Sequence, residues 1–157
     1  MNDETEGMDV CEFWSKDRKE RLISDLNFCT LYKPTDTISD ISEHLFDRSV
    51  NYQSLDMFDH AINDLTWCEE LCKQKITSSI LEEEGNEDEN YFGGFPNFKS
   101  FKTNLLYNRA VCYDAVGKYR EAVDDLYKLL EIDSNDTDAR MILEELLEAT
   151  NIPSRVC

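Results

Sequence analysis

The chain has 157 residues, enough for one compact domain, and its eight Phe, seven Tyr and two Trp argue against wholesale disorder. Five Gly and three Pro are few for a turn-rich β-sandwich or barrel, so helices are favoured. The net charge of −18 disfavours nucleic acid and anionic membranes as partners and favours a basic protein segment, unless the charge serves only solubility.

Residues 1–10 are polar and acidic, which predicts a flexible N-terminus and no signal peptide. No stretch approaches the roughly 18 apolar residues that a membrane span needs. The cysteines are scattered, and several fall inside helical patterns, so reduced thiols and a cytoplasmic location are expected. They are Cys11, Cys29, Cys68, Cys72, Cys112 and Cys157.

Residues 11–33 carry an apolar stripe in which Leu22, Leu26 and Cys29 suit one face of a helix. This N-terminal helix, which also contains Trp14, is expected to pack on the helices that follow. Pro34 ends it, because the residue before a proline avoids the helical region. The next three residues offer helix N-caps.

Residues 38–81 predict two helices separated by a break at residues 53–56. Apolar and small residues recur at helical spacing in both helices: Ile41, Leu45, Ser49 and Tyr52 in the first, then Phe58, Ala61, Ile62, Leu65 and Cys68 in the second. Residues 82–101 follow as an insert that is acidic at first and then aromatic, with Gly and Pro.

Residues 102–136 predict a second helix-turn-helix, with Gly117 in the left-handed conformation that ends its first helix. Residues 137–150 predict a last helix, and residues 151–157 form a tail. The apolar positions of this last helix are Ile142, Leu143, Leu146 and Leu147.

The second helix-turn-helix has the residue spacing of a 34-residue repeat, at Leu106, Ala110, Tyr113, Gly117, Tyr119, Ala122, Leu126 and Leu130. It resembles a tetratricopeptide repeat. Residues 38–81 fit the same frame less closely, with Asp56 in place of the turn glycine. The resemblance implies an all-α, short α-solenoid: one domain over residues 11–150, with two unequal repeats and residues 137–150 as a capping helix.

No nucleotide-binding, hydrolase or metalloprotease motif is present, and neither an enzyme nor a cofactor is expected. His44 and His60 are 16 residues apart and are expected to be structural. Cys68 and Cys72 share a helix face but lack a second ligand pair, so they are expected in the core and not on a metal. Residues 133–137 with Glu144 partly fit a calcium loop, which the repeat-closing turn explains better.

The resemblance also implies a concave groove on the inner helices, lined by Phe46, Val50, Gln53, Tyr107, Asn108, Val111 and Asp114. Such a groove suits a basic or amphipathic peptide segment. Some co-chaperones of this family bind a chaperone's C-terminal carboxylate. At the matching positions only Asn108 fits, so that ligand is disfavoured; the positions are Phe46, Val50, Asn108, Asp138 and Ile142.

Two questions stay open in the sequence. The aromatic stretch at residues 91–98 either folds back into the groove or is displayed to a partner. The chain is expected to be a non-catalytic adaptor for protein–protein interaction. The alternatives are a structural subunit of a multiprotein assembly, for example a trafficking complex, and a metal-binding protein.

Overall fold

The computed structural model describes residues 37–82 and 91–155 of the chain. These residues form α2 (Ile38–Ser54), α3 (Phe58–Glu82), α4 (Phe98–Ala115), α5 (Tyr119–Ile132) and α6 (Thr137–Thr150). The expected all-α fold is confirmed: in the described ranges the only extended pairing is an isolated bridge between Phe92 and Phe95. The helix expected at residues 11–33 lies outside the described residues.

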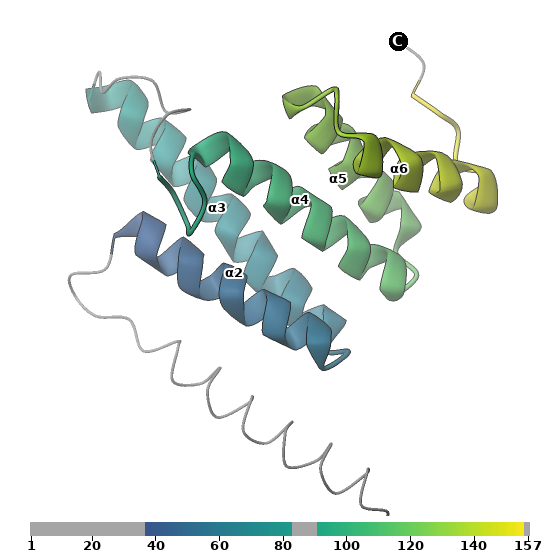
Figure 1. Cartoon of the computed structure of the whole chain (residues 1–157), viewed down its shortest axis with the longest axis horizontal. Helices are drawn as coiled ribbons and strands as arrows, with labels where there is room; N and C mark the ends of the chain where they lie inside the picture. The colour runs from purple at the N-terminus through teal and green to yellow at the C-terminus, as the bar shows by residue number, and fades with distance from the viewer. Residues whose placement is uncertain (1–36, 83–90, 156–157) are drawn as a thin grey trace, which may run out of the picture.

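The helices stack as hairpins in chain order. Helix α2 pairs with α3 and α4 with α5, while α3 packs on α4 and α5 on α6. In Figure 1 the inner helices α2, α4 and α6 lie toward the viewer, with the outer helices α3 and α5 behind them. None of the helices among the described residues combines the length and the apolar character needed to cross a membrane.

Side-chain caps set where the helices begin. The Thr37 hydroxyl accepts from the Asp40 amide at 3.1 Å, and the Asp40 carboxylate accepts from the Thr37 amide at 2.8 Å, which together form a capping box. Asn97 accepts from the Ser100 amide at 2.7 Å. Helix α4 therefore starts at Phe98, four residues before the expected start at residue 102.

Left-handed residues end the inner helices of both hairpins. Gly117 has φ +78°, as its place after α4 predicts, and Asp56 has φ +57° at the corresponding place after α2. The chain after α6 uses Asn151 in the same way, at φ +54°. Aspartate and asparagine tolerate this region better than other residues with a side chain, so the missing glycine in the first turn is accommodated.

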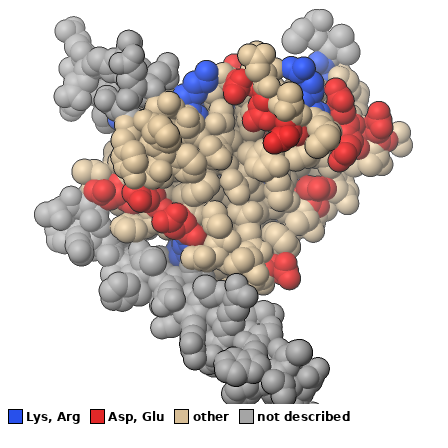
Figure 2. Space-filling view, in the orientation of Figure 1, with Lys and Arg blue, Asp and Glu red and all other residues tan. Residues whose placement is uncertain are grey.

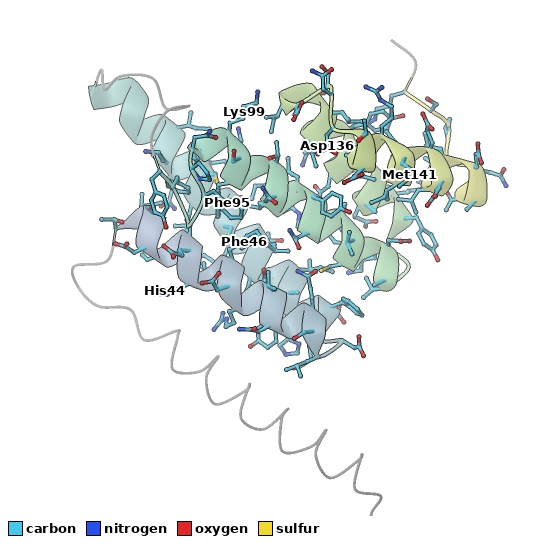
Figure 3. All side chains as sticks on the ribbon, in the orientation of Figure 1. His44, Phe46, Phe95, Lys99, Asp136 and Met141 are labelled. Carbon is cyan, nitrogen blue, oxygen red and sulfur yellow. The ribbon has the colours of Figure 1, made fainter. Side chains whose placement is uncertain are left out.

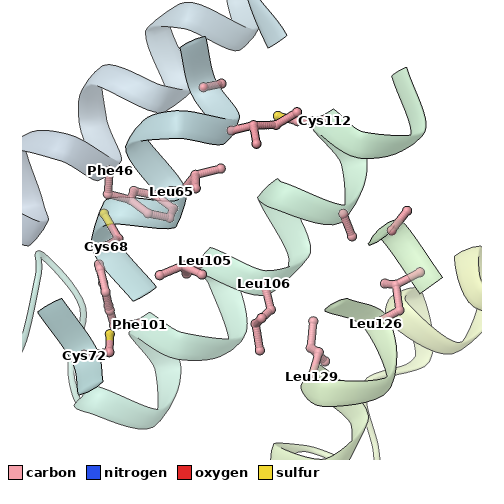
Figure 4. Close-up of a cluster of buried hydrophobic side chains, with 14 of the residues drawn as sticks. Phe46, Leu65, Cys68, Cys72, Phe101, Leu105, Leu106, Cys112, Leu126 and Leu129 are labelled. Carbon is pink, nitrogen blue, oxygen red and sulfur yellow. The ribbon is translucent and has the colours of Figure 1, made fainter. Parts of the chain in front are cut away.

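The core runs without a break through both hairpins, as the close-up in Figure 4 shows. Small residues at the helix crossings (Ser49, Ala61, Ala110 and Ala122) are at most 1% exposed, so the paired helices approach closely there. Large side chains fill the layers between them, the largest fully buried ones being Phe101, Leu65, Leu126 and Leu129.

The aromatic stretch after the acidic insert folds into a tight turn. The amide and carbonyl of Phe92 bond to the carbonyl and amide of Phe95, at 3.0 and 2.9 Å. Gly93 and Gly94 both have positive φ, +57° and +87°, which a type I′ turn requires. The Gly93 amide donates to the Ser39 hydroxyl at 2.9 Å, which ties the turn to α2.

Two glycine substitutions separate backbone strain from steric conflict. Gly117→Ala is expected to cost about 1–2 kcal/mol of unfolding free energy, because only the left-handed backbone opposes it. Gly93→Ala should cost a further ~1–3 kcal/mol, since its Cβ would lie 2.5 Å from the fully buried ring of Phe101. Urea unfolding followed by circular dichroism measures both. Equal losses of unfolding free energy in the two variants would show that the Phe101 ring moves aside to make room for the added Cβ.

Candidate protein-binding groove

The inner face of α2, α4 and α6 brings most of the expected groove residues together. Gln53 of α2 donates from Nε2 to Oδ1 of Asn108 on α4 at 3.4 Å, which joins the two helices at the middle of the face. Val50 and Asp114 are exposed, and Val111 is half-buried. The face therefore presents apolar, amide and carboxylate groups side by side.

A hollow of about 180 Å³ lies between α4 and the start of α6. Thr103, Asn104 and Tyr107 of α4 line one side, and Asp136 and Asp138 line the other. One aromatic ring and two carboxylates thus converge on one small space, which is a suitable setting for a cationic side chain. Tyr107 was expected in the groove.

Asp138 was named from the sequence only as a position that disfavours a carboxylate ligand, and the other lining residues of the hollow (Thr103, Asn104 and Asp136) were not predicted to lie in the groove. Thr103, Tyr107 and Val111 follow one another at intervals of four, so the helical period could have placed Thr103 on this face. The same spacing relates Asn104 to Asn108. Asp136 could not be found that way, because it lies in the turn before α6 and reaches the hollow only through the packing of α6.

The polar side chains of α4 are held in place by its own backbone. Nδ2 of Asn104 donates to the Ser100 carbonyl and Nδ2 of Asn108 to the Asn104 carbonyl, both at 2.8 Å. These bonds fix the side-chain rotamers before any partner arrives. Less conformational entropy is then lost on binding.

Charge on this face lies at its edges. Figure 2 shows acidic side chains gathered along α2 on one side and around α6 on the other, with an uncharged area between them. The middle of this face is therefore uncharged, and its carboxylates lie toward the sides.

Phe46 lies on the same face but is covered by the aromatic turn. Its ring centroid is 5.1 Å from that of Phe95, edge to face, and 5.8 Å from that of Phe101, and the residue is only 8% exposed (Figure 3). The aromatic stretch could either fold back or be displayed to a partner, and Phe92 and Phe95 are folded back. Phe46 is thus not accessible to a partner while the turn is in place. Tyr91 remains exposed.

Behind the groove, a buried ion triad joins the two hairpins. Arg109 of α4 donates from Nε and Nη2 to the two carboxylate oxygens of Asp125 on α5, at 2.7 and 2.8 Å. Its Nη1 donates to Oε2 of Glu69 on α3 at 2.7 Å. Arg109 and Asp125 are almost completely buried. One guanidinium therefore fixes α3, α4 and α5 relative to one another.

Arg109 and Glu69 of the triad stay ionised at neutral pH. Burial alone would lower the pKa of Arg109, but hydrogen bonds to Asp125 and Glu69 raise it above its usual value. Burial alone would raise the pKa of Glu69, and the hydrogen bond and charge of Arg109, with the charge of Lys128, bring it below its usual value. Arg109 and Glu69 thus each keep their charge because they are hydrogen-bonded to each other.

The first hairpin contains the same Arg–Asp pair at positions 61 residues earlier. Arg48 donates from Nε and Nη2 to the two oxygens of Asp64, at 2.7 and 2.5 Å. Its guanidinium lies 5.8 Å from the centroid of the Tyr52 ring. The same distance from Arg109 to Tyr113 is 5.9 Å. Sequence reasoning missed this pair, although the 61-residue offset between the hairpins aligns all its members.

The thiols expected in the core lie there. Cys68, Cys72 and Cys112 are buried, and burial raises the pKa of Cys72 to about 12 and that of Cys112 to about 11. Such thiols stay protonated at neutral pH, which does not suit a nucleophile. Within the described ranges no three His, Cys, Asp or Glu residues cluster as a metal site would require.

The acidic turn before α6 is accounted for by helix capping. The carboxylate of Asp133 accepts from the Asn135 amide at 3.1 Å, and Asp136 caps α6 by accepting from the Ala139 amide at 2.9 Å. Of the two histidines, His44 is exposed, and His60 is exposed with its ring 5.1 Å from that of Tyr52.

Stacked antiparallel hairpins with small residues at the crossings define a short helical-repeat protein. Residues 103–136 match the family model of the tetratricopeptide repeat and comprise most of α4, all of α5 and the turn before α6. The chain thus contains a tetratricopeptide repeat, a unit that generally mediates protein–protein interaction. A comparison with curated proteins found no match.

Removing Arg109 is expected to destabilise the protein strongly. Arg109→Leu removes both hydrogen bonds to the buried carboxylate of Asp125 and leaves it only Lys128, whose Nζ lies 3.9 Å away, at a cost of roughly 3–5 kcal/mol of unfolding free energy. Lys128→Leu is the matched control: Lys128 approaches Glu69 at 3.6 Å but is 51% exposed, so its loss should cost under ~1 kcal/mol. Urea unfolding at neutral pH compares them, and similar small losses would contradict the role given to Arg109.

The buried thiols are expected to resist alkylation. Cys68, Cys72 and Cys112 should react with iodoacetamide only after unfolding in urea, because they are buried and protonated. Mass spectrometry of proteolytic peptides measures the labelling of each residue. Rapid labelling of Cys72 in the native protein would show that α3 opens away from α4.

Proposed function

We propose that this chain is a non-catalytic cytoplasmic adaptor that binds a basic or amphipathic segment of a partner protein. The binding surface is the open part of the inner face, defined here as the residual groove: Val50, Gln53, Tyr107, Asn108, Val111, Asp114 and the lining of the hollow between α4 and α6. Helices α2 and α3 act as a divergent first repeat, and α6 as the cap of a domain over residues 11–150.

The observation that carries the proposal is the hollow beside Tyr107. A Lys or Arg side chain entering it would lie against the aromatic ring and close to the carboxylates of Asp136 and Asp138. A free chain-terminal carboxylate would be repelled by the same two groups. The hollow therefore favours cationic ligands over the acidic tails that some tetratricopeptide proteins bind.

The apolar side of the ligand has its own complement on the same face. Val50 is 44% exposed, and Val111 follows Tyr107 by one helical turn on α4. A segment with apolar residues on one side and Lys or Arg on the other can contact these positions together with the hollow. The aromatic turn at residues 91–98 closes the end of the groove near Phe46, which directs the ligand toward α6.

Selection from a randomised peptide display library tests this function directly. Peptides bound by the full chain should be enriched in Lys, Arg and apolar residues. Asp114→Lys with Asp138→Lys reverses two exposed groove charges and should weaken the selected peptides roughly 10-fold or more. Fluorescence anisotropy at two salt concentrations measures the affinities, which should fall as salt rises.

The control variant carries the same change in net charge on the outer side of the array. Glu121→Lys with Glu131→Lys, both exposed on α5, should leave the peptide affinities within about twofold of the wild type. Enrichment of acidic peptides would contradict the proposal. Equal weakening by both double variants would show that the effect comes from net charge and not from the groove.

A further inference from the structure

A second hollow, which we call the outer hollow, lies where α3, α4 and α5 meet and has a volume of about 270 Å³. Its apolar lining comes from all three helices: Cys72 and Ile76 of α3, Leu105 and Leu106 of α4, and Ile132 of α5. Asn104 and Tyr107 line the hollow beside α6 instead. The helical period places these two residues on the opposite side of α4 from Leu105 and Leu106. The outer hollow is therefore separate from the residual groove.

The floor of the outer hollow is part of the hydrophobic core. Cys72, Leu105 and Leu106 are between 2% and 5% exposed and belong to the continuous core shown in Figure 4. Ile76 and Ile132 complete the apolar lining and are partly buried. Pockets for drug-sized ligands have volumes of roughly 300–1,000 Å³. The outer hollow is smaller than these, so it suits a single large apolar side chain better than a cofactor.

Lysines gather around the outer hollow, although the chain as a whole has 34 acidic and only 16 basic residues. The charged residues of its lining are three lysines and two glutamates: Lys73, Lys102, Lys128, Glu69 and Glu131. Oε2 of Glu69 already accepts from the buried guanidinium of the triad at 2.7 Å. Ammonium groups thus outnumber carboxylates here, whereas the charged groups of the hollow beside α6 are two carboxylates. The outer hollow favours an anion, and the residual groove favours a cation.

Two of these lysines can bond to a further carboxylate while they keep their present contacts. Lys128 is 51% exposed, and its Nζ approaches Glu69 at 3.6 Å and Asp125 at 3.9 Å, which is beyond hydrogen-bond distance. The ammonium of Lys102 lies 5.4 Å from the centroid of the Phe98 ring, a contact that a carboxylate on the same ammonium does not displace. Because an ammonium group has several N–H donors, each can hold an additional anion.

We propose that the outer hollow is a second docking site, which binds an acidic segment of a partner protein through one large apolar side chain. A Leu or Phe of the partner enters the space above Leu105 and Leu106, and Asp or Glu residues beside it bond to Lys102 and Lys128. A second copy of this chain is disfavoured as the occupant, because two chains of net charge −18 repel each other. An adaptor with both sites joins a basic segment to an acidic one.

Binding of defined peptides to the full chain tests the second site. The probes are synthetic peptides with one central Phe or Leu between Asp and Glu residues, and the matched control peptides have Ala at the central position. Fluorescence anisotropy should detect binding of the probes. The Ala peptides should bind roughly 10-fold more weakly or worse, because they leave the apolar floor unfilled. Equal binding of both sets, or no binding of either, would overturn the proposal.

Neutralising the lysines locates the acidic peptides on the protein. Lys102→Gln with Lys128→Gln should weaken them roughly 5-fold or more, because two ammonium groups at the outer hollow are lost. Lys118→Gln with Arg120→Gln is the matched control, which removes the same charge from exposed positions at the other end of α5 and should leave the affinities within about twofold. Circular dichroism checks that both variants keep the wild-type helix content. Equal weakening by the two variants would reject the site.

Methyl NMR separates this site from the residual groove. The acidic peptides should shift the methyl signals of Ile76 and Ile132, which line the outer hollow, and leave those of Val50 and Val111 unchanged. Basic peptides selected for the groove should do the reverse, so either site can fail without the other. Shifts of the Val50 and Val111 signals by the acidic peptides would contradict the proposal. Dimers in light scattering that the lysine double variant abolishes would assign the outer hollow to a second copy and overturn it.

Discussion

A buried guanidinium constrains this array more tightly than its apolar contacts do. Arg109 carries one positive charge into a space shared by α3, α4 and α5, and it can remain there only while Asp125 and Glu69 are within bonding distance. Apolar side chains tolerate small shifts between helices, but three hydrogen bonds from one planar group do not. The triad therefore holds α4 and α5 of the second hairpin against α3 of the first.

The aromatic turn solves the problem that a two-hairpin array exposes apolar surface that further repeats would cover. Phe92 and Phe95 cover the rings of Phe46 and Phe101, with centroid distances of 5.0 to 5.8 Å. The outer edge of the cluster carries cations, since Lys75 lies 5.5 Å from the centroid of the Phe92 ring. The insert therefore completes the core at one end of the groove and leaves the end near α6 open.

Local patterns predicted the second hairpin and α6 well. Their helices follow regular apolar spacing, and Gly117 and Asp136 mark the turns by their own backbone preferences. The start of α4 was predicted four residues too late, because Pro96 and the two preceding glycines favour a loop. Asn97 nevertheless caps the helix directly after them. Nothing local could place Phe95 on Phe46, since the two are far apart in the chain and meet only through tertiary packing.

The ion pairs were missed for a different reason. Arg48 and Asp64 are 16 residues apart and lie on different helices, so no helical or strand period joins them. Only a comparison of the two hairpins at their 61-residue offset aligns the pair with Arg109 and Asp125. Among the groove residues, those on α4 were predictable from its period, whereas the accessibility of Phe46 depended on an insert that has no counterpart in the repeat.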